Sequence, residues 1–169
     1  LINDVLDLAK VEAGKLELRP EPVELLAIVT EVRAVLRPLR QTKRIALEAH
    51  VDPTLGEIVL DPGRMKQVLY NYLSNALKFT PEGGHVTVRV TPEQETTFRV
   101  EVQDDGPGIS PGDVARLFTD FEQLESGFLP DGSGHGPLSA GPFPRRNRGT
   151  GLGLALTRRP VEAQGGQVG

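Results

Sequence analysis

Three short segments of this sequence combine residue types that could bind a charged ligand. Asn71, Asn75 and Lys78 recur at the spacing of one helix face, so two amides and one ammonium lie along the same side. Downstream lie an acidic glycine turn over residues 104–109 (DDGPGI) and a second glycine run over residues 149–154 (GTGLGL). Each glycine run alone is a weak signal, because glycine serves many ordinary turns. Found together in this order, the three segments indicate one nucleotide pocket.

The polar stripe of Asn71, Asn75 and Lys78 suits a metal ion and phosphate groups. An amide oxygen is a hard, neutral ligand for Mg²⁺, and a lysine ammonium neutralises phosphate charge. The alternative is a solvated helix face, which is the usual place for polar residues. Amides are unusual there beside the commoner Glu and Lys, and these two flank apolar positions closely. The binding interpretation is therefore favoured.

The two glycine segments suit different parts of a nucleotide. A predicted strand delivers Asp104 to its end, where Gly106 and Gly108 follow. The carboxylate can accept a hydrogen bond from the exocyclic amine of a base while the backbone folds beneath it. The alternative is a plain Asp-Gly turn. After Thr150 an apolar pattern begins a helix, whose N-terminal N–H groups can bind an anion.

Between the glycine segments, residues 122–148 change abruptly to Gly, Pro, Ser and basic residues, which predicts a long loop. The loop is either an inert insertion or a lid, and its position between two glycine motifs favours a lid. Arg145, Arg146 and Arg148 at its far end could meet phosphates. The alternative for these arginines is a solvated cluster of charges.

Composition limits the class of protein. With 169 residues, 38% hydrophobic and 25% charged, the chain fits one globular domain with a real core. A net charge of -4 disfavours nucleic acid as the main partner. The absence of cysteine excludes disulfides and cysteine-ligated metals and fits a reducing cytosol. No apolar run approaches the roughly 18 residues that a membrane span requires.

Other kinds of site find little support. The sequence has no phosphate-binding G-x-x-x-x-G-K-[ST] loop, and the second glycine run follows Pro and Arg residues instead of an apolar strand. His50, His85 and His135 are scattered among a strand, a strand edge and a loop, so neither a zinc site nor a hydrolase triad is indicated.

Apolar spacing predicts a helix over residues 1–16 with a seam that needs a partner helix, the alternative being an ordinary core-facing helix. Pro20 and Pro22 mark a joint. A second helix is predicted over residues 23–39, with Pro38 where it frays. Its apolar face would comprise Leu25, Leu26, Val29, Val32 and Leu36.

A third helix is predicted from Asp61 and Pro62 to about Lys78. Asp accepts from free backbone N–H groups at a helix start, and Pro at the first position sacrifices no hydrogen bond. The buried face of this helix would comprise Met65, Leu69, Tyr72, Leu73, Ala76 and Leu77.

Alternating apolar residues predict the strands. Residues 45–51 and 57–60 are each predicted to form a short strand. Residues 85–90 and 98–102 are predicted to pair in antiparallel fashion, joined across residues 91–97.

Together, these motifs resemble the catalytic, ATP-binding part of a sensor histidine kinase, of the family shared with gyrase, Hsp90 and MutL. Residues 67–84 are similar to the asparagine box of that family, and residues 104–109 and 149–154 to its two glycine boxes. Phe118 and Phe121 resemble its phenylalanine box. The resemblance covers nearly the whole chain.

The resemblance implies a role for each matching residue. Asn75 would coordinate Mg²⁺, Asn71 would contact phosphate or metal, and Lys78 would reach the phosphates, with Asn71 and Lys78 taking the catalytic roles. Asp104 would accept from the adenine amino group. The remaining nucleotide-binding residues would be Phe79, Gly106, Gly108, Ile109, Arg148, Gly149, Thr150, Gly151, Leu152 and Gly153.

The implied fold is a two-layer α/β (α+β) sandwich of the Bergerat type, with a mixed, mainly antiparallel sheet covered on one face by helices. Residues 1–18 would finish a dimerisation and phosphoacceptor helix. Residues 19–169 would form the catalytic domain, with an ATP lid at 122–148 and a truncated C-terminus whose closing strands are absent. Pro160 is expected to kink or end the last helix.

The implied reaction is transfer of the γ-phosphoryl group of ATP to a histidine, in which positioning and charge neutralisation provide most of the catalysis. The histidine would lie upstream of Leu1, so these residues alone should not autophosphorylate. Implied partners are the protein's own dimerisation domain in a homodimer and a response-regulator receiver domain, without nucleic acid or membrane contact by these residues. The location would be cytoplasmic, with membrane anchoring open for the full-length protein.

Two alternatives remain open from the sequence. An ATPase of the same fold would hydrolyse ATP, but such relatives carry a Glu as general base where this chain has Asn71. A degenerate interaction module would bind nucleotide weakly or not at all. Nucleotide affinity separates this module from the two enzymes.

Overall fold

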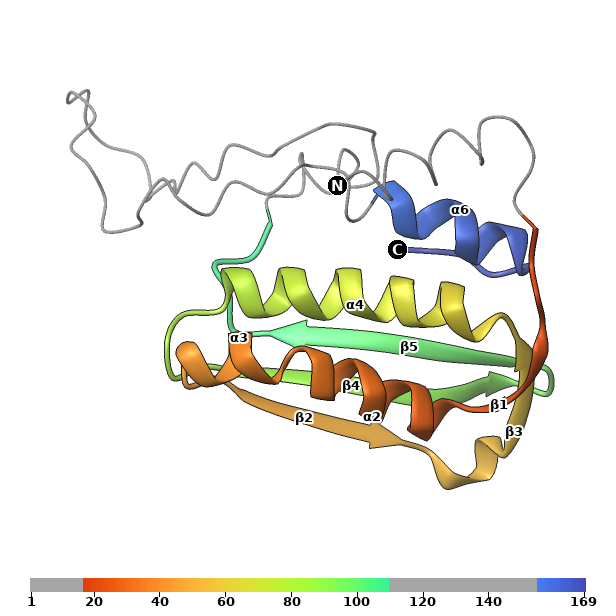
Figure 1. Ribbon diagram of the computed structural model, residues 1–169, viewed down its shortest axis with the longest axis horizontal. Helices are drawn as coiled ribbons and strands as arrows, with labels where there is room; N and C mark the ends of the chain where they lie inside the picture. Colours follow the sequence, from red (N-terminus) through yellow and green to blue (C-terminus); the bar gives the residue numbers. More distant parts are fainter. Residues whose placement is uncertain (1–16, 110–154) are drawn as a thin grey trace.

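The computed structural model describes residues 17–109 and 155–169, which form two layers (Figure 1). Helices α2 (Leu25–Val35) and α4 (Pro62–Phe79) lie over one face of a sheet, and α6 (Ala155–Ala163) runs beside α4. Within the described residues, no helix is both long and apolar enough to cross a lipid bilayer. The predicted two-layer arrangement, with helices on one face of a mixed sheet, is confirmed.

The main sheet has the strand order β2-β4-β5. Strand β2 (Ala46–Val51) pairs in parallel with β4 (His85–Gln94), and β4 pairs in antiparallel fashion with β5 (Thr97–Asp104). The antiparallel pair was predicted, but its connection was placed too broadly at 91–97. The ladder continues to Gln94 opposite Thr97, so only two residues turn the chain.

The core lies between this sheet and the helices. Val86, Val88 and Val90 alternate along β4 and are fully buried. Leu69, Leu73 and Leu77 from α4 are fully buried against the same core. The predicted buried face of α4 is confirmed except at Tyr72, which is half-buried. Burial raises the pKa of the Tyr72 hydroxyl above its usual value, and a hydrogen bond with Thr157 of α6 opposes that shift.

The predicted helix over 23–39 is wrong in its bounds. Residues Glu21–Glu24 form strand β1, which pairs with β3 (Glu57–Leu60) in a separate antiparallel ribbon. Pro20 and Pro22 favour extended backbone at the residues before them, which explains the strand. The helical region then divides into α2 and α3 (Arg37–Thr42).

The break between α2 and α3 follows from Pro38. Its ring cannot continue a helix from the preceding turn, but it fits the first turn of the new helix α3. The predicted fraying at Pro38 is therefore a helix start. On α2, Ile28 is buried, while Leu26 is 56% exposed, so the prediction that placed Leu26 on the apolar face is wrong.

Pro160 lies inside α6 and does not end it, contrary to one of the two expected outcomes. The helix continues to Ala163, and the Pro160 carbonyl accepts a hydrogen bond from the Gln164 side chain at 3.1 Å. Pro160 is itself buried. Burial of the Pro160 ring therefore offsets the lost backbone donor, a cost of about 3 kcal/mol when nothing relieves it.

Asp61 caps α4 as predicted and also ties together distant parts of the chain. Its Oδ1 accepts from the Arg64 backbone N–H at 2.9 Å, and its Oδ2 accepts from the Arg19 N–H at 2.8 Å. Its own N–H donates to the Gln164 side chain at 2.8 Å. Burial raises the pKa of Asp61, but the hydrogen bonds from Arg19, Arg64 and Gly63 outweigh it, so the pKa is lower than usual.

We expect Asp61→Asn to lower the free energy of unfolding by about 1–2 kcal/mol at neutral pH, because an amide cannot accept from both the Arg64 and Arg19 N–H groups. The folded-state pKa of Asp61 is lowered, so its contribution is present above the ordinary value of 3.8 and is lost as pH falls through the folded-state value. Urea unfolding of parent and variant against pH measures this difference.

Asp52→Asn is the matched control, because Asp52 also caps a helical turn through Thr54 but is partly exposed, whereas Asp61 is buried. We expect it to change the free energy of unfolding much less. A difference between Asp61→Asn and the parent that persists undiminished into strong acid would contradict the assigned role of the Asp61 carboxylate.

Candidate nucleotide-binding site

The C-terminal half of α4 carries the predicted polar stripe. Asn71, Asn75 and Lys78 are all partly exposed and share one helix face. Within the described residues, neither amide side chain has a hydrogen-bond partner. Their oxygens are therefore available as neutral ligands for a hard cation.

Lys78 and Phe79 form a cation and aromatic pair at the end of α4. The Lys78 Nζ lies 4.8 Å from the centre of the Phe79 ring, and the ring is 47% exposed. Burial lowers the pKa of the Lys78 ammonium. The exposed ring can pack against the base of a nucleotide, and the ammonium beside it can contact the phosphates.

The turn that follows β5 begins at Asp104, as predicted. One carboxylate oxygen, Oδ1, accepts a hydrogen bond from the Gly106 backbone N–H at 2.8 Å. The other, Oδ2, has no partner among the described residues. Asp104 is exposed, so this second oxygen can accept from an amine on a ligand.

The glycines of this turn meet specific backbone requirements. A Cβ on Gly106 would come within 2.5 Å of Asp104 Oδ1 and 3.4 Å of the Phe79 carbonyl oxygen. Gly108 has a φ of +74°, a backbone conformation that favours glycine. The close approach at Gly106 places the turn directly against the end of α4. Ile109, also predicted for the base pocket, is 51% exposed after the turn.

Asp105 anchors the turn, and sequence reasoning assigned it no role. Its Oδ2 accepts from the His85 backbone N–H at 2.8 Å and lies 3.2 Å from the His85 Nδ1. Its own N–H donates to the His85 carbonyl at 3.2 Å. The predicted antiparallel pairing of these two strands could have indicated this contact. Antiparallel register places the end of β5 beside the beginning of β4, so Asp105 lies next to His85.

The remaining predicted site residues lie outside the described residues. They comprise the lid at 122–148 and the residues Phe118, Phe121, Arg145, Arg146, Arg148, Gly149, Thr150, Gly151, Leu152 and Gly153. The predicted helix over 1–16 also lies outside the described residues. The described residues therefore bring together the stripe of α4 and the Asp104 turn.

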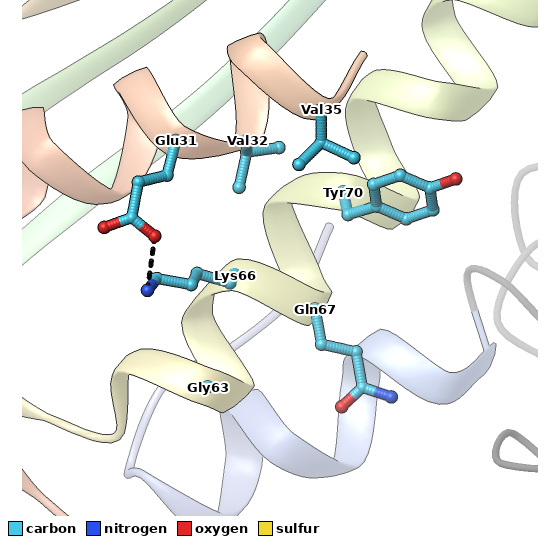
Figure 2. A pocket seen from close by; sticks show the side chains of 7 residues that line it. All are labelled: Glu31, Val32, Val35, Gly63, Lys66, Gln67 and Tyr70. Atoms are coloured by element: carbon cyan, nitrogen blue, oxygen red, sulfur yellow. Dashed lines mark ion pairs between the residues drawn. The ribbon is translucent and has the colours of Figure 1, made fainter.

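A separate hollow of about 340 Å³ lies between α2 and the N-terminal half of α4 (Figure 2). Val32 and Val35 line one side of it, and Tyr70 lies across from them. The Lys66 Nζ reaches the Glu31 carboxylate at 2.5 Å. The predicted nucleotide residues of α4 come from its other half, so this hollow is not the site described above.

Residues 60–169 match the family described as histidine kinase-, DNA gyrase B-, and HSP90-like ATPase. The chain belongs to this ATPase family. The matched range contains both α4 and the Asp104 turn, so the two described parts of the site lie within the family's own domain. The predicted family is confirmed, and the domain is of the ATP-binding type.

Curated relatives support the same conclusion. The chain is 41% identical over 171 residues to the virulence sensor protein BvgS of Bordetella bronchiseptica, covering 99% of this chain and 13% of BvgS. It is 36% identical over 174 residues to the sensor histidine kinase GacS of Pseudomonas protegens, covering 100% of this chain and 17% of GacS. The chain thus spans less than a fifth of these relatives.

Solved structures agree with the fold. Full-length ShkA in complex with AMPPNP aligns with a TM-score of 0.78 and 32% identity, covering 97% of this chain and 30% of ShkA. The catalytic domain of histidine kinase ThkA aligns with a TM-score of 0.67 at 23% identity, covering 86% of this chain and 81% of that chain. The chain therefore has the fold of a histidine kinase catalytic domain.

Proposed function

We propose that this ATPase-family chain is the catalytic module of a two-component sensor histidine kinase, which binds Mg²⁺-ATP and transfers the γ-phosphoryl group to a histidine. The observation that carries the proposal is the contact between the two halves of the site. Gly106 lies against the Phe79 carbonyl, so the Asp104 turn and the polar end of α4 face one ligand. Relatives named as histidine kinases support this choice within the family.

The adenine end of the ligand is assigned to the Asp104 turn. Asp104 Oδ1 is used by the Gly106 N–H, and Oδ2 accepts a hydrogen bond from the adenine amino group. Gly106, Gly108 and Ile109 form the base pocket, and the exposed Phe79 ring lines it. A carboxylate acceptor selects an amine over the carbonyl that guanine has at the same position.

The phosphate end of the ligand is assigned to α4. Asn75 holds Mg²⁺, Asn71 contacts metal or phosphate, and Lys78 neutralises phosphate charge. These residues fit a metal ion carried by the nucleotide, because neither amide has a partner among the described residues and phosphates would supply the remaining oxygen ligands. The described residues contain no cluster of acidic or histidine side chains that would hold a metal by itself. When bound, Mg²⁺ would supply positive charge next to the phosphoryl group that is transferred.

The other assignments rest on family membership. Residues 1–18 finish the dimerisation helix, residues 19–169 form the catalytic domain, and residues 122–148 act as its lid. Arg148 and the glycine run from Gly149 to Gly153 hold the phosphates. The protein acts in the cytoplasm as a homodimer and passes its phosphoryl group to a receiver domain. ThkA has been solved in complex with the response regulator TrrA.

The experiment uses a chain that carries these residues together with a histidine-bearing dimerisation helix. With γ-labelled ATP and Mg²⁺, we expect label on the protein that is lost in acid and kept in base, as phosphohistidine behaves. Lys78→Met should reduce the labelling at least tenfold, because an ammonium no longer neutralises the phosphates. Lys66→Met, on the other half of α4, is the matched control and should label normally.

Release of labelled phosphate without protein labelling would contradict phosphoryl transfer and favour an ATPase of the same fold. Failure of the folded chain to bind nucleotide would favour an interaction module.

A further inference from the structure

Lys43 makes an unusual set of contacts with the end of α4. Its ammonium donates hydrogen bonds to the carbonyls of Leu77 at 2.8 Å, Lys78 at 2.7 Å and Thr80 at 2.6 Å. A lysine ammonium has only three N–H donors, so all of them are used. Burial lowers the pKa of Lys43, whereas the three carbonyl acceptors favour its charged form.

These contacts provide hydrogen-bond partners for carbonyls at the end of α4. The last carbonyls of a helix have no partner within the helix. Here the Thr80 backbone N–H and hydroxyl both donate to the Ala76 carbonyl, at 2.9 and 2.7 Å. Lys43 satisfies the Leu77 and Lys78 carbonyls, and the Phe79 carbonyl lies against Gly106. A cation at this position is also favoured by the helix dipole.

The backbone around Lys43 is held firmly. The Arg44 N–H donates to the Gln41 carbonyl and the Ile45 N–H to the Arg40 carbonyl, which is the Schellman pattern of a helix C-terminus. The Schellman pattern requires a residue in the left-handed conformation, which is usually glycine. Here that residue is Arg44, with a φ of +52°. This turn ends α3 and fixes the direction in which the Lys43 side chain points away from the backbone.

Further backbone bonds join the Lys43 segment to both halves of the site. The Gly83 N–H donates to the Lys43 carbonyl at 2.9 Å, and the Ala46 N–H donates to the Gly84 carbonyl at 3.0 Å. Gly84 precedes His85, whose backbone and side chain contact Asp105. The segment from Lys43 to Ala46 is therefore hydrogen-bonded both to the end of α4 and to the residues just before β4.

We infer that Lys43 is a positioning residue for the nucleotide site: its ammonium fixes the end of α4, and with it Lys78 and Phe79, against the Asp104 turn. This inference rests on the proposed nucleotide-binding function. Lys43 itself is assigned no contact with the nucleotide. It acts by holding the carbonyls on either side of Phe79.

The absence of cysteine allows a matched test at this one position. The Lys43→Cys chain is alkylated with 2-bromoethylamine, which rebuilds an ammonium on a side chain of lysine length, or with iodoacetamide, which adds a neutral amide. Two readouts are used: amide hydrogen exchange without nucleotide, and calorimetric affinity for the ATP analogue AMPPNP with Mg²⁺. Val29→Ala, a buried substitution on α2, controls for loss of stability alone.

We expect the neutral form to exchange the Thr80 and Gly83 amides about tenfold faster or more, with Leu69 and Leu73 in the middle of α4 unchanged, because hydrogen bonds from a charged donor hold the helix end. Its affinity for AMPPNP should fall about tenfold. The aminoethylated form should recover both values, and Val29→Ala should keep its affinity while the chain remains folded.

Equal exchange at Thr80 and Gly83 in the two alkylated forms would overturn the positioning role. Equal AMPPNP affinity in the two forms would overturn its link to the site. If no form of the folded chain binds AMPPNP, the proposed function fails and with it the link to nucleotide, while the exchange data still decide whether Lys43 fixes the helix end.

Discussion

Asp104→Asn is expected to lower the affinity of the chain for an ATP analogue by about tenfold or more while changing its affinity for the matching GTP analogue much less. The reason lies in how the two carboxylate oxygens are used. Oδ1 accepts from the Gly106 N–H, and an asparagine oxygen can replace it there. The asparagine NH₂ then takes the place of Oδ2 and presents a donor to the adenine amino group, which is also a donor.

The same change suits guanine better, because guanine presents a carbonyl where adenine presents an amine. Loss of a hydrogen bond that involves a charged group costs about 1.5–3 kcal/mol, which corresponds to a tenfold change or more. Competition titrations with the two nucleotides measure the ratio of affinities directly. Equal binding of ATP and GTP by the parent chain would refute the role of Asp104 as the adenine acceptor.

Asn75→Ala is expected to remove the dependence of nucleotide binding on Mg²⁺. The Asn75 side chain is partly exposed, has no hydrogen-bond partner among the described residues and shares a face with Asn71. The variant should therefore fold normally, and its free energy of unfolding should stay the same or rise by about 0.5 kcal/mol, because alanine is the better helix former.

The measurement is the ratio of ATP-analogue affinities with and without Mg²⁺. In the parent chain we expect the ratio to be at least tenfold, and in Asn75→Ala close to one. Lys66→Ala is the control, since Lys66 is partly exposed on the N-terminal half of α4 and faces away from the polar stripe, toward Glu31. A variant Asn75→Ala that keeps the Mg²⁺ dependence of the parent would remove Asn75 from the metal site.

The parts of the site that were predicted from sequence have strong local signals. Helix α4 is marked by the Asp61 and Pro62 cap and by an apolar repeat, and both were confirmed. The spacing of Asn71, Asn75 and Lys78 on that helix followed directly from helical geometry. The Asp104 turn was found because glycines follow a strand end.

The parts that sequence reasoning missed depend on contacts between distant residues. The cap on α4 from Lys43 joins residues 34–37 positions apart, and no local pattern marks it. Strand β1 contains Pro22, which was interpreted together with Pro20 as a simple joint, and its pairing with β3 decides its structure. Pro160 lies inside a helix because tertiary packing overrides its intrinsic cost. The Asp105 contacts with His85 likewise need the register of β4 and β5.

The most direct test is calorimetric titration of this chain with AMPPNP in the presence and absence of Mg²⁺, with circular dichroism to show that the sample is folded. The proposed site predicts saturable binding to one site per chain that is strengthened at least tenfold by Mg²⁺. A folded chain that shows no binding, or the same binding with and without Mg²⁺, would contradict a Mg²⁺-ATP site formed by α4 and the Asp104 turn.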